Sequence, residues 1–252
     1  MALDRAGVSR RGLLRGGGLA AAGWMAGALL PHGARAALPE AVREELRACQ
    51  PSGDPLQALL EGNQRFAAAW QAAAGPMASS QRRRRLLALL ADNCQLDPEA
   101  LAQGQKPWAA ILSCADSRVP TELMFDRGVG ELFNVRCAGN TAFADGVASM
   151  EYAVAVLKVP LILVVGHSGC GAVAAAQDPQ ASLTPLLTDL VRPIRASLVP
   201  GESLEAATKT NARAAAATML QASEVLAAAV KEGRLRVAAS YFDIGSGRVA
   251  LL

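Results

Sequence analysis

The sequence is poor in aromatic residues and histidine, and it has no long apolar run. Aromatic side chains make up 4% of the 252 residues, and only two residues are histidine. The five cysteines include no C-x-x-C pair, which argues against a zinc ribbon and a thioredoxin-like redox site. Hydrophobic residues make up 52% and charged residues 19%, so the chain is not a disordered polyelectrolyte.

The formal net charge of +3 is placed unevenly along the chain. Residues 1–36 hold five arginines and one aspartate, which leaves 20 basic and 21 acidic groups for the remaining 216 residues. Residues 37–252 are nearly neutral and lack the excess of basic groups that binds nucleic acid, so no nucleic-acid partner is expected. The run Arg82 to Arg85 is interpreted as a solvated face or an interface, because no second basic cluster accompanies it.

The first 36 residues are similar to a twin-arginine export signal. Arg10 and Arg11 precede a mild apolar run over residues 16–30, and residues 34–36 (A-R-A) are small at the positions that a signal peptidase reads. The run is shorter than the roughly 20 residues that span a bilayer. A retained anchor or a basic tail is the alternative. We expect the twin-arginine machinery to export the chain to a periplasm, or to a thylakoid lumen, with no stable membrane span in the mature protein.

The rest of the chain, residues 37–252, is expected to form one α/β domain that begins with a helical arm over residues 38–93. Asp54-Pro55 is a good helix start, because it joins a capping side chain to a proline at the first helical position. The expected strands cover residues 109–113, 131–135, 161–165, 235–242 and 248–252, and further helices cover residues 82–90, 144–157, 170–176 and 204–231. This alternation predicts a mostly parallel sheet flanked by helices on both faces, with a closing hairpin.

Two of the expected strands end in metal-ligating residue types. Cys114 follows the first strand, and His167 and Cys170 follow the third. Because carboxyl ends of parallel strands meet at one edge of a sheet, these side chains are expected to gather there. Two thiolates and one imidazole with a fourth position open favour Zn²⁺.

Another interpretation of the same glycine-rich turn is weaker. Residues 166–169 (G-H-S-G) are similar to a nucleophile elbow, but position 170 is cysteine instead of glycine. His167 is also the only histidine outside the leader and is the covalent neighbour of Ser168, so no separate base is available for a serine triad. The odd number of cysteines argues against a fully paired disulfide framework, and whether Cys49 pairs with Cys94 is left open.

Residues 114–120 (C-A-D-S-R-V-P) and 166–171 (G-H-S-G-C-G) resemble the two zinc motifs of the β-class carbonic anhydrases. The likeness runs from about Asp54 to the C-terminus and includes the segments 130–136, 138–140 and 241–243. The resemblance implies that zinc is bound by Cys114, His167 and Cys170, that Asp116 and Arg118 form a polar dyad beside it, and that Gln105 contacts the substrate.

The resemblance also implies an activity, the reversible hydration of carbon dioxide to bicarbonate and a proton by zinc-bound hydroxide. Asp116 would accept a hydrogen bond from the hydroxide while Arg118 keeps Asp116 ionised. The family assembles as homodimers or multiples of dimers, in which N-terminal helices wrap a neighbour. Two alternatives stay open, a CS₂ or COS hydrolase on the same zinc site and a non-enzymatic zinc or bicarbonate sensor.

Overall fold

The computed structural model describes residues 38–91 and 93–252, so the predicted leader over residues 1–36 lies outside the described residues. Leu38–Leu252 form one compact unit. The strands found there are Ala109–Cys114 (β1), Leu132–Cys137 (β2), Leu161–His167 (β3), Arg236–Asp243 (β4) and Arg248–Leu251 (β5). The α-helices are Glu40–Glu45 (α1), Pro55–Ala72 (α2), Ser79–Ala91 (α3), Pro98–Gln103 (α4), Thr121–Met124 (α5), Ala144–Ala155 (α6), Gly171–Gln177 (α7), Pro185–Ser197 (α8), Leu204–Ala222 (α9) and Glu224–Lys231 (α10), and a 3₁₀ turn (η1) spans Ala138–Asn140.

The strands form one sheet in the order β2-β1-β3-β4-β5, in which only β5 runs antiparallel to its neighbour. This confirms the predicted mostly parallel sheet and the closing hairpin. From β1 the chain crosses to β2 on one side, whereas β3 returns on the other side. The carboxyl ends of β1 and β3 therefore flank the point where the strand order reverses, which is where open α/β sheets bind their ligands.

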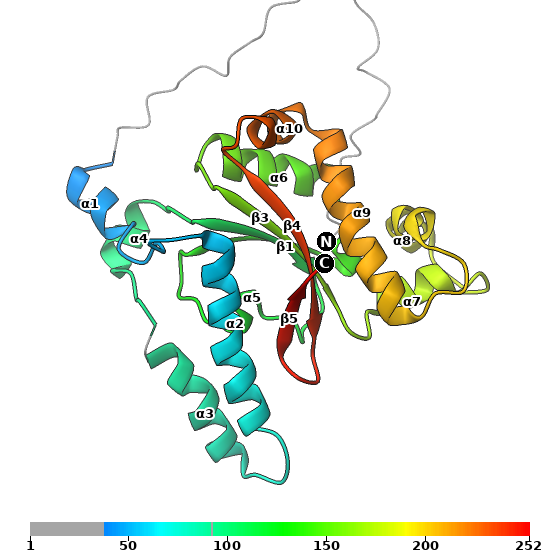
Figure 1. The fold of residues 1–252 in the computed structure, drawn as a ribbon, viewed down its shortest axis with the longest axis horizontal. Coiled ribbons are helices and arrows are strands. Elements are labelled where there is room, and N and C mark those ends of the chain that lie inside the picture. The colour runs from blue at the N-terminus through cyan, green and yellow to red at the C-terminus, as the bar shows by residue number, and fades with distance from the viewer. Residues whose placement is uncertain (1–37, 92) are drawn as a thin grey trace, which may run out of the picture. The chain divides into compact units, whose positions relative to one another are not determined.

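Helices cover both faces of the sheet, as predicted (Figure 1). Every residue of β1 and β3 is buried, so these strands are apolar on both sides. Ala110 and Leu112 pack in a cluster with α6, α9 and α10, whereas Ile111 packs in a second cluster with α2. Because side chains alternate along a strand, β1 lies between two apolar layers.

Helix α2 of the helical arm begins as the sequence indicates. The side chain of Asp54 accepts a hydrogen bond from the Leu56 N–H, and Pro55 occupies the first turn of α2. Further along α2, buried Asn63 donates to the carbonyls of Met124 and Gly247 and accepts from the Val249 N–H. This one amide therefore ties α2 to both α5 and the β4–β5 hairpin.

The prediction of helices beyond residue 180 is wrong in two respects. The helix expected over residues 204–231 is two helices, α9 and α10, because Ser223 leaves the helical region (φ −130°, ψ 109°) and caps α10 by accepting from the Leu226 N–H. Serine competes for backbone hydrogen bonds, which favours a helix start over a helix interior. The sequence analysis also missed α8, which begins at Pro185 after its cap Thr184.

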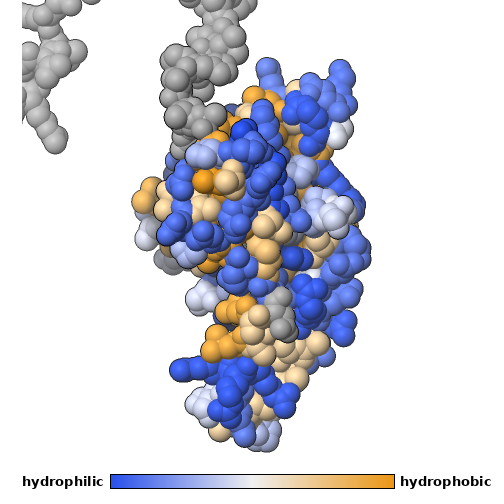
Figure 2. All heavy atoms as spheres, turned by 90° about the vertical axis from the view of Figure 1, so that its left-hand side faces the viewer, coloured by the Kyte–Doolittle hydropathy of each residue, from blue (hydrophilic) through white to orange (hydrophobic). Residues whose placement is uncertain are grey.

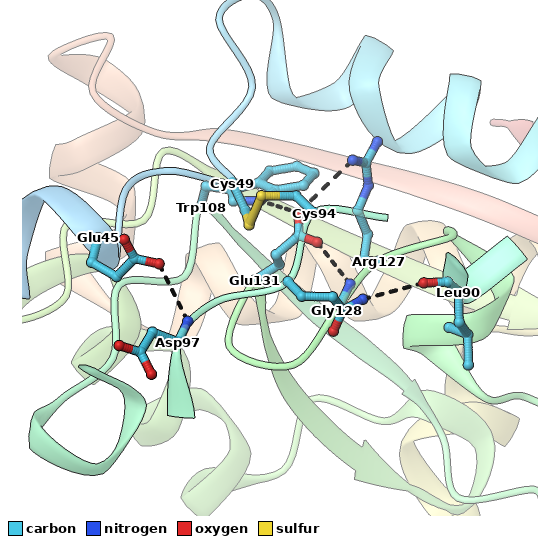
Figure 3. Close-up of a disulfide and its surroundings, with 10 residues drawn as sticks. Glu45, Cys49, Leu90, Cys94, Asp97, Trp108, Arg127, Gly128 and Glu131 are labelled. Atoms are coloured by element: carbon cyan, nitrogen blue, oxygen red, sulfur yellow. Dashed lines mark hydrogen bonds and ion pairs between the residues drawn. A yellow bond between two sulfur atoms is a disulfide. The ribbon is translucent and has the colours of Figure 1, made fainter. Parts of the chain in front are cut away.

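A disulfide joins Cys49 to Cys94, with 5.4 Å between their Cα atoms. It resolves the pairing that the sequence left open, and it closes a segment that contains α2 and α3. Figure 3 shows the bridge beside Trp108 and Glu131, at the amino end of the sheet. Trp108 Nε1 and the Gly128 N–H both donate to the buried carboxylate of Glu131. The bridge thus joins the segment before α2 to the segment after α3, beside this hydrogen-bonded part of the core.

Removal of this bridge is expected to destabilise the protein without affecting the opposite edge of the sheet. A cross-link between residues 45 apart is worth about 4 kcal/mol in the chain-entropy model. The variant Cys49→Ala/Cys94→Ala should lose roughly that much free energy of unfolding, measured by guanidinium denaturation. Cys137→Ala, which removes a free thiol, is the control. Equal stability of the double variant and the control would show that the bridge contributes nothing.

Candidate metal centre

Three buried side chains gather where β1 and β3 end. The Cys114 and Cys170 sulfurs and a ring nitrogen of His167 lie within 4.8 Å of one another. Cys114 and His167 are the last residues of their strands, and Cys170 directly precedes α7. Gly169, at φ +65°, makes the turn that brings Cys170 back toward His167, a conformation that glycine adopts without cost. The structure therefore brings together all three residues that the sequence analysis singled out as metal ligands.

The hydrogen bonds of His167 leave one nitrogen ready to bind a metal. Nδ1 lies 3.1 Å from the Ser168 carbonyl oxygen, which can only accept, so the ring proton is on Nδ1. Nε2 is fully buried and has no hydrogen-bond partner among the described residues. A buried nitrogen without a partner is costly. A bound cation at Nε2 removes that cost, and a backbone carbonyl on the other nitrogen is the usual support of a ligating histidine.

The two sulfurs shift each other's pKa in opposite directions. The pKa of Cys114 is lowered to about 4, chiefly because the Cys170 thiol donates a hydrogen bond to the Cys114 sulfur and also because the Gly139 N–H donates to it. The pKa of Cys170 is raised by the same hydrogen bond and by burial. Metals bind thiolates rather than thiols, so a cation between the sulfurs favours loss of the second proton. The donor set thus fits a divalent metal such as Zn²⁺.

Asp116 and Arg118 form a forked ion pair beside this cluster. Arg118 donates from Nε to Oδ1 at 2.9 Å and from Nη2 to Oδ2 at 2.6 Å, and its backbone N–H donates to Oδ1. These hydrogen bonds hold the pKa of Asp116 well below its usual range, so the group is a carboxylate at neutral pH. Oδ2 lies 3.9 Å from His167 Nε2, and the carboxylate therefore faces the position that a metal on His167 would occupy.

Two residues that the sequence analysis did not assign to the site donate hydrogen bonds to Cys114, one to its carbonyl and one to its sulfur. Arg136, near the end of β2, donates to the Cys114 carbonyl at 3.1 Å and to the Asp116 carbonyl at 2.7 Å. Gly139, in η1, donates its N–H to the Cys114 sulfur at 3.3 Å. The sequence signal for this residue is the glycine itself, which readily adopts the left-handed φ of +73° that the turn requires.

Gln105 lies near the amino end of β1, opposite to the end at which the metal-ligand candidates gather. It is exposed and precedes the first residue of β1, whereas Cys114 is the last. The six residues of β1 span about 20 Å at about 3.3 Å per residue. The neighbouring Lys106 is held there, because its Nζ donates to the Leu157 carbonyl and its own carbonyl accepts from Gln50. Within one chain, the structure does not bring Gln105 to the cluster.

Fold and site together define an α/β protein with a buried Cys₂His centre at the switch point of a mostly parallel sheet. A family model described as carbonic anhydrase matches residues 109–249, which is more than half of the chain and includes all three candidate ligands. The chain belongs to the carbonic anhydrase family.

Curated relatives agree with that assignment. The chain is 47% identical over 121 residues to a protein of Mycobacterium tuberculosis named carbonic anhydrase 2, a match that covers 48% of this chain and 50% of the relative. It is 36% identical over 160 residues to the carbonic anhydrase of Mycolicibacterium smegmatis, covering 60% and 78% of the two chains. The chain thus spans about half the length of the M. tuberculosis relative.

Solved structures place the fold in the β class. A tetrameric β-carbonic anhydrase of Sordaria macrospora matches with a TM-score of 0.56 and 28% identity, covering 61% of this chain and 84% of that one. A β-carbonic anhydrase of Aspergillus fumigatus matches with a TM-score of 0.55 and 27% identity over 79% and 91% of the two chains. These likenesses confirm the fold class that the sequence analysis expected.

Proposed function

We propose that this chain catalyses the reversible hydration of carbon dioxide to bicarbonate and a proton, with zinc held by Cys114, His167 and Cys170. The observation that carries the proposal is the buried Nε2 of His167, which has no partner among the described residues and lies between two cysteine sulfurs and a carboxylate. Zn²⁺ in such a site activates water as a nucleophile near neutral pH. Family membership supports the reaction.

In this proposal the protein supplies position and charge. The Ser168 carbonyl fixes the His167 ring, so that Nε2 keeps its lone pair toward the metal position. Asp116, charged and held by Arg118, offers an acceptor beside that position and orients a reacting hydroxyl by taking its hydrogen bond. Apolar residues of α7, α8 and α9 pack around Cys114 and Cys170 and keep water away from the sulfurs.

Gln105 takes part in this reaction only if it comes from a second copy of the chain, because its own site lies about 20 Å away. We therefore propose a homodimer or a multiple of dimers.

None of the described side chains of α3 is buried, although the helix carries four leucines. Leu86, Leu87, Leu90, Leu123 and Val129 are among the residues that line a groove of about 670 Å³. Figure 2 shows apolar side chains gathered on this face of the molecule.

Charge placed in this groove is expected to reduce the mass of the assembly. Leu87 is 53% exposed in the single chain, and Val129 is 72% exposed. If a second copy covers them, Leu87→Glu/Leu90→Glu should shift sedimentation equilibrium toward smaller species, because each buried carboxylate loses its hydration. Ala88→Glu is the matched control, since Ala88 is an exposed residue of α3 outside the groove. An unchanged mass for the double variant would contradict the proposed interface.

We further propose that the chain is exported by the twin-arginine machinery to a periplasm, or to a thylakoid lumen. The disulfide between Cys49 and Cys94 supports this location, because such bonds persist in oxidising compartments. No helix within residues 38–91 and 93–252 is long and apolar enough to cross a membrane.

Replacement of the paired arginines of the leader is expected to stop export. Arg10→Lys/Arg11→Lys keeps the charge but removes the guanidinium pair that the export pathway is expected to read. Cell fractionation should then find the protein, folded and zinc-loaded, almost entirely in the cytoplasm. Arg5→Lys/Arg15→Lys makes the same exchange elsewhere in the leader and should leave export intact. Normal export of the first variant would rule out the twin-arginine route.

The direct test of the activity is stopped-flow hydration of carbon dioxide by the purified protein, with its zinc content measured on the same sample. Fast turnover with one zinc per chain is the expected result. Zinc at one per chain without turnover would overturn the proposal, and COS and CS₂ offered to the same sample would then show whether the site hydrolyses these instead.

A further inference from the structure

Asn211 is a buried amide that lies outside the metal cluster and yet is connected to it. It sits on the inner face of α9, where its side chain is only 3% exposed. Its Nδ2 donates to the Gly139 carbonyl at 2.8 Å. This bond links the long helix α9 to the 3₁₀ turn η1 that follows β2, across 72 residues of sequence. Asn211 therefore holds the turn from which the sulfur of Cys114 receives a hydrogen bond.

Gly139 is confined from several sides. Its φ of +73° is a left-handed conformation, and a Cβ on this residue would lie 2.5 Å from Ile194 Cδ1 and 3.1 Å from Ala172 Cβ. The turn therefore has no room to move toward α7 and α8, while the amide of Asn211 fixes its carbonyl from α9. Under these constraints the Gly139 N–H points at the Cys114 sulfur at 3.3 Å.

We propose that Asn211 is a positioning residue of the metal site, which holds Gly139 so that its N–H donates to the metal-binding sulfur of Cys114. The inference rests on the proposed function, because it takes Cys114 as a metal ligand. The N–H···S hydrogen bond withdraws charge from the thiolate and fixes its direction, and groups behind the ligands commonly set both metal affinity and ligand electronics. Asn211 acts only through Gly139.

The chain offers a matched control for this role. Asn63 is also a buried asparagine, 3% exposed, that donates to two backbone carbonyls. Its partners, Met124 and Gly247, belong to α5 and the β4–β5 hairpin and not to the metal cluster. Loss of either amide leaves buried carbonyls unpaired, so both variants lose stability. Only the loss at Asn211 is expected to change the metal site.

The experiment replaces zinc by Co²⁺ in the purified full chain, because the thiolate-to-cobalt charge-transfer absorption reports the charge on the sulfur. In Asn211→Leu the band should move to longer wavelength, since a thiolate that loses a hydrogen bond donates charge more readily. Competition with a chromophoric chelator should show a zinc affinity about 10-fold to 100-fold weaker, the range found when such supporting groups are removed. Asn63→Leu should keep the band and the zinc affinity of the unchanged protein.

Asn211→Ala is measured alongside, because it removes the amide without adding volume and keeps the test valid if the leucine variant does not fold. A band and a zinc affinity equal to those of the unchanged protein, in a variant that is merely less stable, would overturn the role of Asn211 and leave the proposed function standing. If the unchanged protein itself showed no thiolate-to-cobalt band, the proposed metal site would be wrong, and this inference would fall with it.

Discussion

The variants Cys114→Ala and His167→Ala are each expected to lose zinc and carbon dioxide hydration together. Each change leaves two of three ligands at a buried site, and the chain has no other described cluster of this kind to replace them. We expect zinc to fall from one per chain to near zero. Turnover should fall by more than about 10⁴-fold, since the acceleration by enzymes is typically 10⁶-fold or more and here depends on the activated water.

The measurement is zinc by atomic emission and hydration by stopped flow on the same samples. Cys137→Ala is the control, because Cys137 stands directly opposite Cys114 in the neighbouring strand but does not belong to the cluster. It bonds instead to Thr141 and should be dispensable for the metal. Full zinc occupancy in Cys114→Ala would show that this sulfur is not a ligand.

The second large effect is expected at Asp116. Asp116→Asn should retain zinc but lose roughly 10²-fold in turnover, the scale of loss when a reacting group is poorly oriented. The variant has nearly the same shape, but its amide nitrogen meets the donors of Arg118 and its charge beside His167 is gone. The loss is therefore expected in kcat, with zinc content unchanged.

A matched control for Asp116 is Asp126→Asn. Asp126 is also paired with an arginine, since Arg65 Nε lies 2.6 Å from its Oδ2, but it contacts no member of the metal cluster. This variant should change stability and leave turnover close to normal. If Asp116→Asn behaved in the same way, Asp116 would be a structural ion pair without a role in the reaction.

The sequence predicted the sheet and the three clustered ligands because both depend on local pattern. Continuous apolar runs mark buried strands, and residues that follow parallel strands must meet at one edge. The placement of Gln105 was not predictable in this way, because a match to a family motif does not say which copy of the chain supplies the residue. The interruption of the expected helix at Ser223 was also not predictable, since the alanine-rich segments on both sides favour helix equally.

The supporting residues were harder to predict than the ligands. Asn211 lies in an alanine-rich helix, and nothing in its neighbourhood along the chain distinguishes it from a surface asparagine. Its partner Gly139 is 72 residues away, and the two meet only after α9 has packed against the sheet. Such contacts arise from tertiary packing, which a single sequence does not display.

The sheet separates the five cysteines into two groups with different chemical fates. Cys49 and Cys94 are bridged at the amino end of β1, whereas Cys114, Cys137 and Cys170 are free thiols near its carboxyl end. The strand between them spans about 20 Å, far beyond the reach of a disulfide. Once folded, the protein can therefore be oxidised at one end without scrambling the thiols at the other. The fold itself separates the two cysteines that form a cross-link from the free thiols, of which Cys114 and Cys170 belong to the proposed metal site.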